Sequence, residues 1–252
     1  ANFYFMAGVL HFLPTQPSLI DLIHLLRYYN IVLGAATALL LFLLLDHLVP
    51  KLFAIAGAIV FALDPFILLQ NGQVMLETGG MFWVLLSYYI LFLRLDNGDR
   101  LGTIYAILCG TGCGFALLSK DVYFFLTILP LCVFYVLNWV LRRRETIICI
   151  VTSVLVYAIY LFDVFRRGYM PDFIDQKFSG LLRLAGVVQI TGFNRDVGPS
   201  LTEKLIERLS QYGTSYLLIA LCGACLLILL FDQRNKSRII FAMAIGAFAL
   251  PT

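Results

Sequence analysis

The sequence predicts an all-α protein that crosses the membrane repeatedly, as a bundle of about eight transmembrane helices. Apolar residues make up 61% of the 252 positions and charged residues only 13%, whereas soluble domains average about 45–50% and 25%. Apolar runs of about 18 to 22 residues recur along the chain, and each is long enough to cross about 30 Å of hydrocarbon. A water-soluble core of this size could not bury so much apolar surface, so lipid is the expected solvent.

The first element is expected at the membrane surface. Residues 14–29 carry Asp21, His24 and Arg27 at i, i+3 and i+6. This spacing places a polar stripe along an otherwise apolar helix, which is typical of an interfacial segment.

Transmembrane spans follow wherever an apolar run is long enough to reach across the bilayer. They are expected at residues 30–49, 52–70, 73–93, 102–119, 122–141, 146–164 and 214–231, with a truncated span from 239. The chain thus divides into transmembrane helices over 1–164, a polar loop over 165–213 and C-terminal transmembrane helices over 214–252. Because it lacks a starting Met and stops inside an unfinished span, it reads as a piece of a longer protein.

The loop over 165–213 is too polar to be a span, since it holds seven of the 18 basic residues and five of the 15 acidic ones. Within it, Ser200 and Glu203 have the spacing of a capping box. Leu201, Leu205 and Leu209 then recur every four residues. We expect an amphipathic helix that runs to about residue 213 and lies along the membrane surface.

The short loops predict the orientation. Residues 47–51, 94–100, 142–145 and 232–238 together hold nine basic residues, and the positive-inside rule places such loops in the cytoplasm. The polar loop over 165–213 is then extracytoplasmic, because long loops translocate more freely. We expect a multi-pass plasma-membrane protein whose cytoplasmic helix ends carry ordinary flanking charges.

Several classes of site are not supported by the sequence. No basic stretch is interleaved with aromatic residues, as nucleic-acid binding would require. All six cysteines fall inside apolar runs, where a thiol packs as a small hydrophobe. No His or Cys set has zinc-ligand spacing. We therefore expect no cofactor; a divalent metal is conceivable, but no residue pattern supports one.

The predicted topology places five ionisable residues at the outer ends of helices: Arg27, Asp64, Glu77, Lys120 and Asp121. A charge beside hydrocarbon costs several kcal/mol unless it is paired or hydrated, so such groups usually mark a water-filled cavity or a functional site. We predict an outward-facing polar pocket that binds a substrate through these residues.

Each of these residues also has a structural interpretation. Asp64 precedes Pro65, where a turn-forming Asp is common, so it could simply cap a helix. Lys120 and Asp121 could pair with each other in an exposed loop, for about 0 to 1 kcal/mol. Glu77 is followed closely by Gly79 and Gly80 in the first turns of a span, where small residues admit a ligand or another backbone.

Four stretches occur in an order that resembles a known enzyme family. They read LRYYNIVLGAATALL at 26–40, ALDP at 62–65, VMLE at 74–77 and GCGFALLSK at 112–120. The first resembles the opening of the second span in polytopic GT-C glycosyltransferases of the protein O-mannosyltransferase and aminoarabinose-transferase type, similar to glycosyltransferase family 39. The resemblance implies a GT-C-like helix bundle and covers residues 1 to about 140.

Enzymes of this kind transfer a sugar from a polyprenyl phosphate or diphosphate to a protein, lipid or glycan on the outer membrane face. The resemblance therefore implies a bilayer-embedded enzyme with a polyprenyl-linked sugar donor. It places Glu77 near the acceptor and gives Lys120 the position of an outer cationic residue. The catalytic carboxylate is expected in an acidic outer loop ahead of Ala1, and neither the sugar nor the acceptor is implied.

A non-catalytic protein remains the alternative. It could be a degenerate relative that serves as a subunit of a larger assembly, or a transporter. Transporters usually show internal repeats and helices broken near the bilayer midplane, and neither is evident in the sequence.

Overall fold

A computed structural model describes residues 18–47, 49–72, 76–97, 102–137 and 141–184, together with 206, 207, 209, 210 and 213. The helices are α2 (Leu19–Asp46), α3 (Lys51–Leu63), α4 (Pro65–Gly72), α5 (Leu76–Asn97), α6 (Gly102–Ser119), the 3₁₀ helix η2 (Asp121–Leu126), α7 (Ile128–Leu137), α8 (Arg143–Arg166) and α9 (Met170–Leu184). No strand occurs among these residues. The predicted all-α membrane bundle is confirmed.

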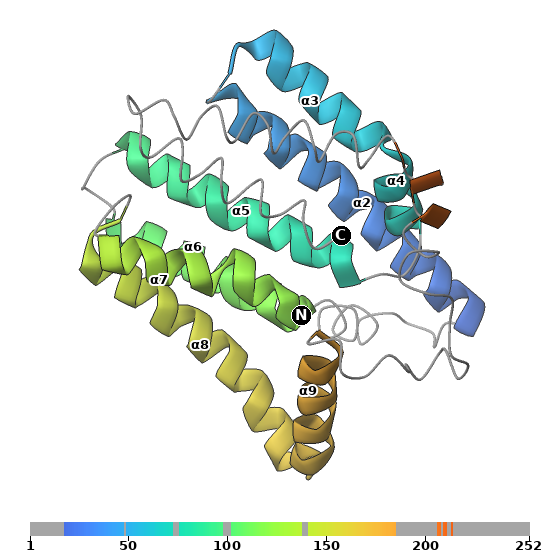
Figure 1. The fold of residues 1–252 in the computed structure, drawn as a ribbon, viewed down its shortest axis with the longest axis vertical. Coiled ribbons are helices and arrows are strands. Elements are labelled where there is room, and N and C mark those ends of the chain that lie inside the picture. The colour runs from blue at the N-terminus through green and yellow to red at the C-terminus, as the bar shows by residue number, and fades with distance from the viewer. Residues whose placement is uncertain are drawn as a thin grey trace.

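The long helices lie side by side in the order α3, α2, α5, α6 and α8 (Figure 1). Within the described part of the chain, three helices are long and apolar enough to cross a membrane, and they correspond to α2, α6 and α8. The chain is an integral membrane protein, and the total of about eight spans stays a prediction because the C-terminal ones lie outside the described residues.

Small residues let α6 pack closely between α5 and α8. A side chain at Gly110 or Gly114 would collide with α8, and one at Gly112 would collide with Ser87 of α5. The Ser153 hydroxyl of α8 donates a hydrogen bond of 2.9 Å to the Gly110 carbonyl. Without a hydrophobic drive between helices in lipid, such close backbone contacts and interhelical hydrogen bonds hold spans together.

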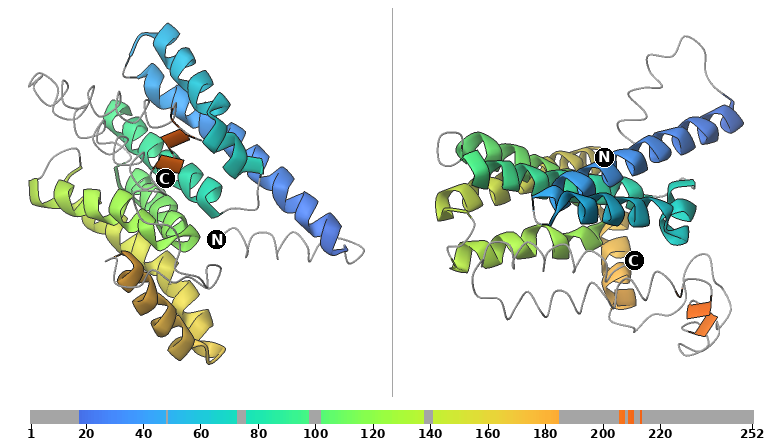
Figure 2. Two further views of the ribbon diagram at one scale, coloured as in Figure 1. Left: turned by 45° about the vertical axis from the view of Figure 1, so that its right-hand side comes forward. Right: turned by 90° about the horizontal axis from the view of Figure 1, so that it is seen from above.

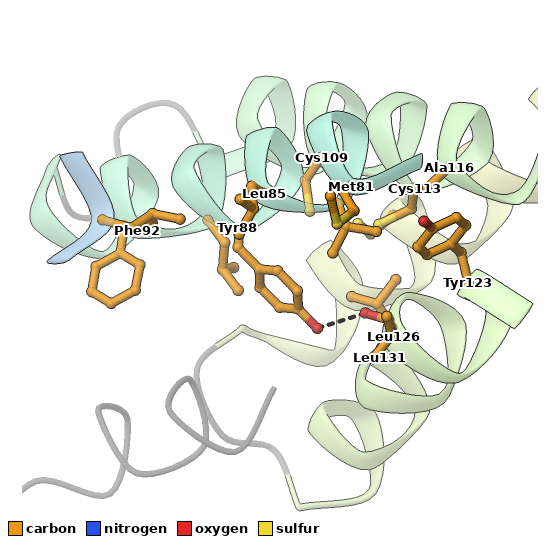
Figure 3. Packing of buried hydrophobic residues seen from close by; sticks show 14 of the residues in the cluster. Met81, Leu85, Tyr88, Phe92, Cys109, Cys113, Ala116, Tyr123, Leu126 and Leu131 are labelled. Carbon is orange, nitrogen blue, oxygen red and sulfur yellow. Dashed lines mark hydrogen bonds between the residues drawn. The ribbon is translucent and has the colours of Figure 1, made fainter. Parts of the chain in front are cut away.

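The core lies between α5, α6 and the segment η2–α7 (Figure 3). Cys109 and Cys113 are buried within it at 4% exposure each, which confirms that these thiols pack in the interior. Tyr88 reaches across the core, where its hydroxyl donates a 2.6 Å hydrogen bond to the Leu126 carbonyl.

The predicted boundaries hold well for three helices. Residues 102–119 form α6 as expected, while α5 and α8 differ from the predicted 73–93 and 146–164 by a few residues at each end. Residues 14–29 and 30–49 differ from the prediction, because one continuous helix, α2, begins at Leu19 and runs to Asp46. No helix breaker separates the two segments, and 28 residues span about 42 Å, more than the hydrocarbon alone.

Two predicted spans are interrupted by proline. The span expected at 52–70 breaks into α3 and α4 at Asp64, because Pro65 disfavours helical backbone in the residue before it. The span expected at 122–141 divides into η2 and α7. Pro130 has no N–H to donate to the Leu126 carbonyl four residues earlier. The Tyr88 hydroxyl donates a hydrogen bond to that carbonyl instead.

The polar loop over 165–213 holds a helix that the sequence analysis did not predict, α9. For the amphipathic helix predicted in residues 200–213, the described positions 206, 207, 209, 210 and 213 are helical. Its capping box at Ser200 and Glu203 lies outside the described residues, as do the spans predicted at 214–231 and from 239.

Candidate functional site

The candidate site lies where α5 begins and α6 ends. These two helices run antiparallel, so residues 43 positions apart in sequence meet at one end of the bundle. Glu77 lies in the first turn of α5. Lys120 directly follows α6 and precedes η2, in extended backbone.

Glu77 and Lys120 form an ion pair, with 2.5 Å between the Lys120 Nζ and the Glu77 Oε1. Their side chains are 22% and 47% exposed, respectively. At this exposure an ion pair contributes about 0 to 1 kcal/mol, so the pair does little for stability. The Lys120 ammonium thus lies on Glu77, whereas its pairing with Asp121 stays a prediction. The side chain of Asp121, which begins η2, is outside the described part.

Tyr123 of η2 packs against the first turns of α5, beside the Glu77–Lys120 ion pair. Its hydroxyl donates a 2.9 Å hydrogen bond to the backbone carbonyl of Glu77. Its ring occupies the space where Gly80 has no side chain, so any Cβ at residue 80 would overlap the ring. Tyr123 is buried, at 6% exposure. The close approach expected at the glycines beside Glu77 is thus made by an aromatic ring of the same chain.

A second set of polar contacts joins α2, α4 and α5 nearby. The Thr78 hydroxyl donates to the Asn71 Oδ1 at 3.0 Å, and the Asn71 side chain packs against the backbone of α2 at Gly34. Thr78 is fully buried. The start of α5 is therefore held from two sides, which places Glu77 at a defined position.

The other two predicted site residues have different surroundings. Asp64 is buried at 8% exposure and accepts a 3.1 Å hydrogen bond from the Ile67 N–H, so the capping interpretation is confirmed for its carboxylate. Arg27 is exposed and lies in the first half of α2. The beginning of α2 projects past the bundle (Figure 2). Of the five residues, the structure brings Glu77 and Lys120 together.

The opposite end holds an ion pair that the sequence analysis missed. Arg94 donates to Glu145 through Nε at 3.0 Å and through Nη2 at 2.9 Å, and both side chains are only 9% exposed. Gly102 at the start of α6 leaves room for the carboxylate. The expectation of ordinary flanking charges at this end is therefore wrong for these two residues. The bidentate geometry joins α5 to α8.

This geometry can bind an anion at the end near Glu77. An ammonium has three donors, and one of those of Lys120 faces Glu77, so two remain for an oxyanion such as a phosphate. The Lys120 side chain is half-exposed, which leaves it accessible to a ligand from outside the bundle. Among the described residues, no group of three His, Cys, Asp or Glu side chains could hold a metal ion.

Comparison with known proteins identifies the family. The family model described as dolichyl-phosphate-mannose-protein mannosyltransferase matches residues 21–166, more than half of the chain. No curated protein and no solved structure matches the chain. The matched region runs from the third residue of α2 to the end of α8 and includes Glu77, Lys120 and Tyr123. It confirms the resemblance to protein O-mannosyltransferases. The chain belongs to the dolichyl-phosphate-mannose-protein mannosyltransferase family.

Proposed function

We propose that this protein is a glycosyltransferase of the plasma membrane that moves a mannosyl residue from a polyprenyl phosphate to a hydroxyl group of an acceptor protein. Its family supports the lipid-linked donor and the transfer reaction. The distribution of basic residues among the short loops supports a site on the outer face. The observation that carries the location of the site is the Glu77–Lys120 ion pair at that end of the bundle.

In the proposed reaction, the acceptor hydroxyl oxygen attacks the anomeric carbon of the mannosyl group. The bond from that carbon to the phosphate oxygen breaks, and polyprenyl phosphate leaves with one additional negative charge. The hydroxyl proton passes to a carboxylate base, which the family resemblance implies for enzymes of this kind. Preorganised positive charge at the leaving group lowers the barrier because it stabilises the charge that develops there.

Lys120 supplies that charge in this proposal. Lysine binds phosphate as a point charge with three donors. Glu77 holds one N–H and thereby restricts the rotamers of a flexible side chain, while the other two point to phosphate oxygens. Glu77 acts as a positioning residue toward Lys120. Whether its carboxylate also meets the acceptor stays a prediction.

The test uses the full-length protein in lipid vesicles with a synthetic polyprenyl-phosphate mannose and an acceptor peptide. Loss of one charge-assisted contact costs about 1.5–3 kcal/mol, which is roughly a 10- to 150-fold loss in kcat/KM for the donor. We expect this loss in Lys120→Met and a partial recovery in Lys120→Arg. Lys51→Met, at an exposed position at the start of α3, is the control and should retain wild-type rates.

Two results would contradict the proposal at different levels. Wild-type rates in Lys120→Met, with helicity preserved, would remove the phosphate-binding role and leave Lys120 as an interfacial anchor. Donor binding without any transfer by the wild-type protein would instead favour a non-catalytic subunit of the same family.

A further inference from the structure

Helix α9 has an apolar face that the rest of the described chain leaves open. Ile174 and Phe178 lie four residues apart and therefore on one face, and they are 56% and 61% exposed. Asp172 and Gln176 lie on the opposite face, Asp175 lies at the border between the two faces, and all three are exposed. The segment is thus strongly amphipathic while containing many polar residues, a combination typical of a helix in the membrane–water interface.

The turn before α9 places this helix beside the end of α8. Gly168, with φ of +78°, reverses the chain, and the N–H of Tyr169 donates to the Val164 carbonyl at 3.1 Å. The ring of Phe173 then lies 6.0 Å from that of Tyr160. Tyr160 precedes the end of α8 by six residues, which is about 9 Å along the helix.

The lipid-facing surface of α8 continues to this point. Ile159, Phe162 and Phe165 of α8 are at least 67% exposed on a helix long and apolar enough to span the bilayer. Arg166 and Arg167 follow at its end, where basic side chains meet lipid phosphates. A bilayer that covers α8 up to these arginines therefore reaches the level of α9.

Helix α9 leaves the bundle at an angle to the long helices. This angle is seen in Figure 1 and in the right-hand view of Figure 2, whereas the left-hand view projects α9 along α8. It branches from the same end of the bundle that carries Glu77 and Lys120, because α6 and α8 run parallel and both end there.

We propose that the partner of this face is the phospholipid bilayer: α9 is an interfacial anchor whose Ile174 and Phe178 insert into lipid while its acidic side remains in water. Lys177 fits this position, because its ammonium lies 5.0 Å from the centre of the Phe173 ring and its long stem can reach the headgroups. The inference does not depend on the transferase activity, since it uses only the amphipathic face and its continuity with α8.

Site-directed spin labelling of the full-length protein in phosphatidylcholine–phosphatidylglycerol vesicles tests the proposal. A ketone-bearing phenylalanine analogue at residue 174, 175, 176 or 178, coupled to a nitroxide, leaves the native cysteines unchanged. Labels at 174 and 178 should be accessible to oxygen and protected from a water-soluble nickel chelate, at a depth of about 5–10 Å below the headgroups. Labels at 175 and 176 should show the reverse.

Two outcomes would overturn the proposal. Equal exposure of all four labels to the nickel chelate would place α9 in water. Protection of residues 174 and 178 from both oxygen and the chelate would show that protein covers this face, either another part of the chain or a second copy. A matched measurement at residue 159 of α8 gives the reference for a lipid-facing label.

Discussion

The buried Arg94–Glu145 pair predicts a large loss of stability when one partner alone is removed. Glu145→Ala would leave the guanidinium of Arg94 with neither of its two bonds of 2.9 and 3.0 Å to the carboxylate. Both side chains are 9% exposed, so little water could replace the lost partner. Removing one member of a buried pair costs about 3–5 kcal/mol, because Arg94 loses its bidentate carboxylate partner at a position shielded from water.

The chain offers a matched control for this substitution. Asp163 and Arg167 of the α8 end form an i,i+4 pair with side chains 25% and 59% exposed. Asp163→Ala should change the free energy of unfolding by about 1 kcal/mol or less. Replacing both members of the buried pair, Arg94→Met with Glu145→Met, should recover most of the loss, since two apolar side chains leave no buried charge.

Unfolding of the full-length protein in mixed micelles, followed by circular dichroism during a titration with sodium dodecyl sulfate, measures these differences. We expect Glu145→Ala to be less stable than both Asp163→Ala and the double variant. If Glu145→Ala and Asp163→Ala lose the same amount, the pair does not link α5 to α8 energetically, and the argument from burial is refuted.

Three further predictions concern other parts of the fold. Gly80→Ala should destabilise the start of α5 by about 1–3 kcal/mol through overlap with the Tyr123 ring, whereas Tyr123→Phe should lose only about 0.5–1.5 kcal/mol; unfolding titrations that rank them the other way would contradict the packing described. Asp64→Ala should lower stability by about 0.5–2 kcal/mol through loss of a cap, with donor KM unchanged; a raised KM would restore a substrate-binding role. A cysteine at position 190 should react with an impermeant thiol reagent in intact cells and one at 143 should not; the opposite pattern would invert the topology.

Hydropathy and the positions of charges predicted much of this fold for a physical reason. A span needs an apolar run of a certain length, and the run between Gly102 and Lys120 gave the limits of α6 directly. The same rules placed Glu77 and Lys120 at one end of the bundle, because helices joined by short loops alternate in direction. What they could not predict is that the two side chains touch, since contact depends on how α5 and α6 pack.

The errors also have identifiable causes. Pro65 and Pro130 lie inside apolar runs, so a prediction based on hydropathy gives one continuous span at each. Each proline nevertheless removes a backbone hydrogen-bond donor, which favours a break in the helix. Arg94 and Glu145 are 51 residues apart. Counting the charges of each loop separately therefore predicted two solvent-exposed flanking residues and not a buried pair. Helix α9 was hidden because its polar face gives residues 165–213 the average composition of a loop.

The central claim, that Lys120 contacts the phosphate of the lipid donor, is tested most directly by equilibrium binding. Full-length protein in nanodiscs is titrated with polyprenyl-phosphate mannose in the absence of acceptor, and the dissociation constants of the wild type, Lys120→Met and Lys51→Met are compared. We predict a Kd roughly 10- to 150-fold weaker in Lys120→Met, with Lys51→Met unchanged. Equal dissociation constants for all three proteins would contradict the account and separate the Glu77–Lys120 pair from donor recognition.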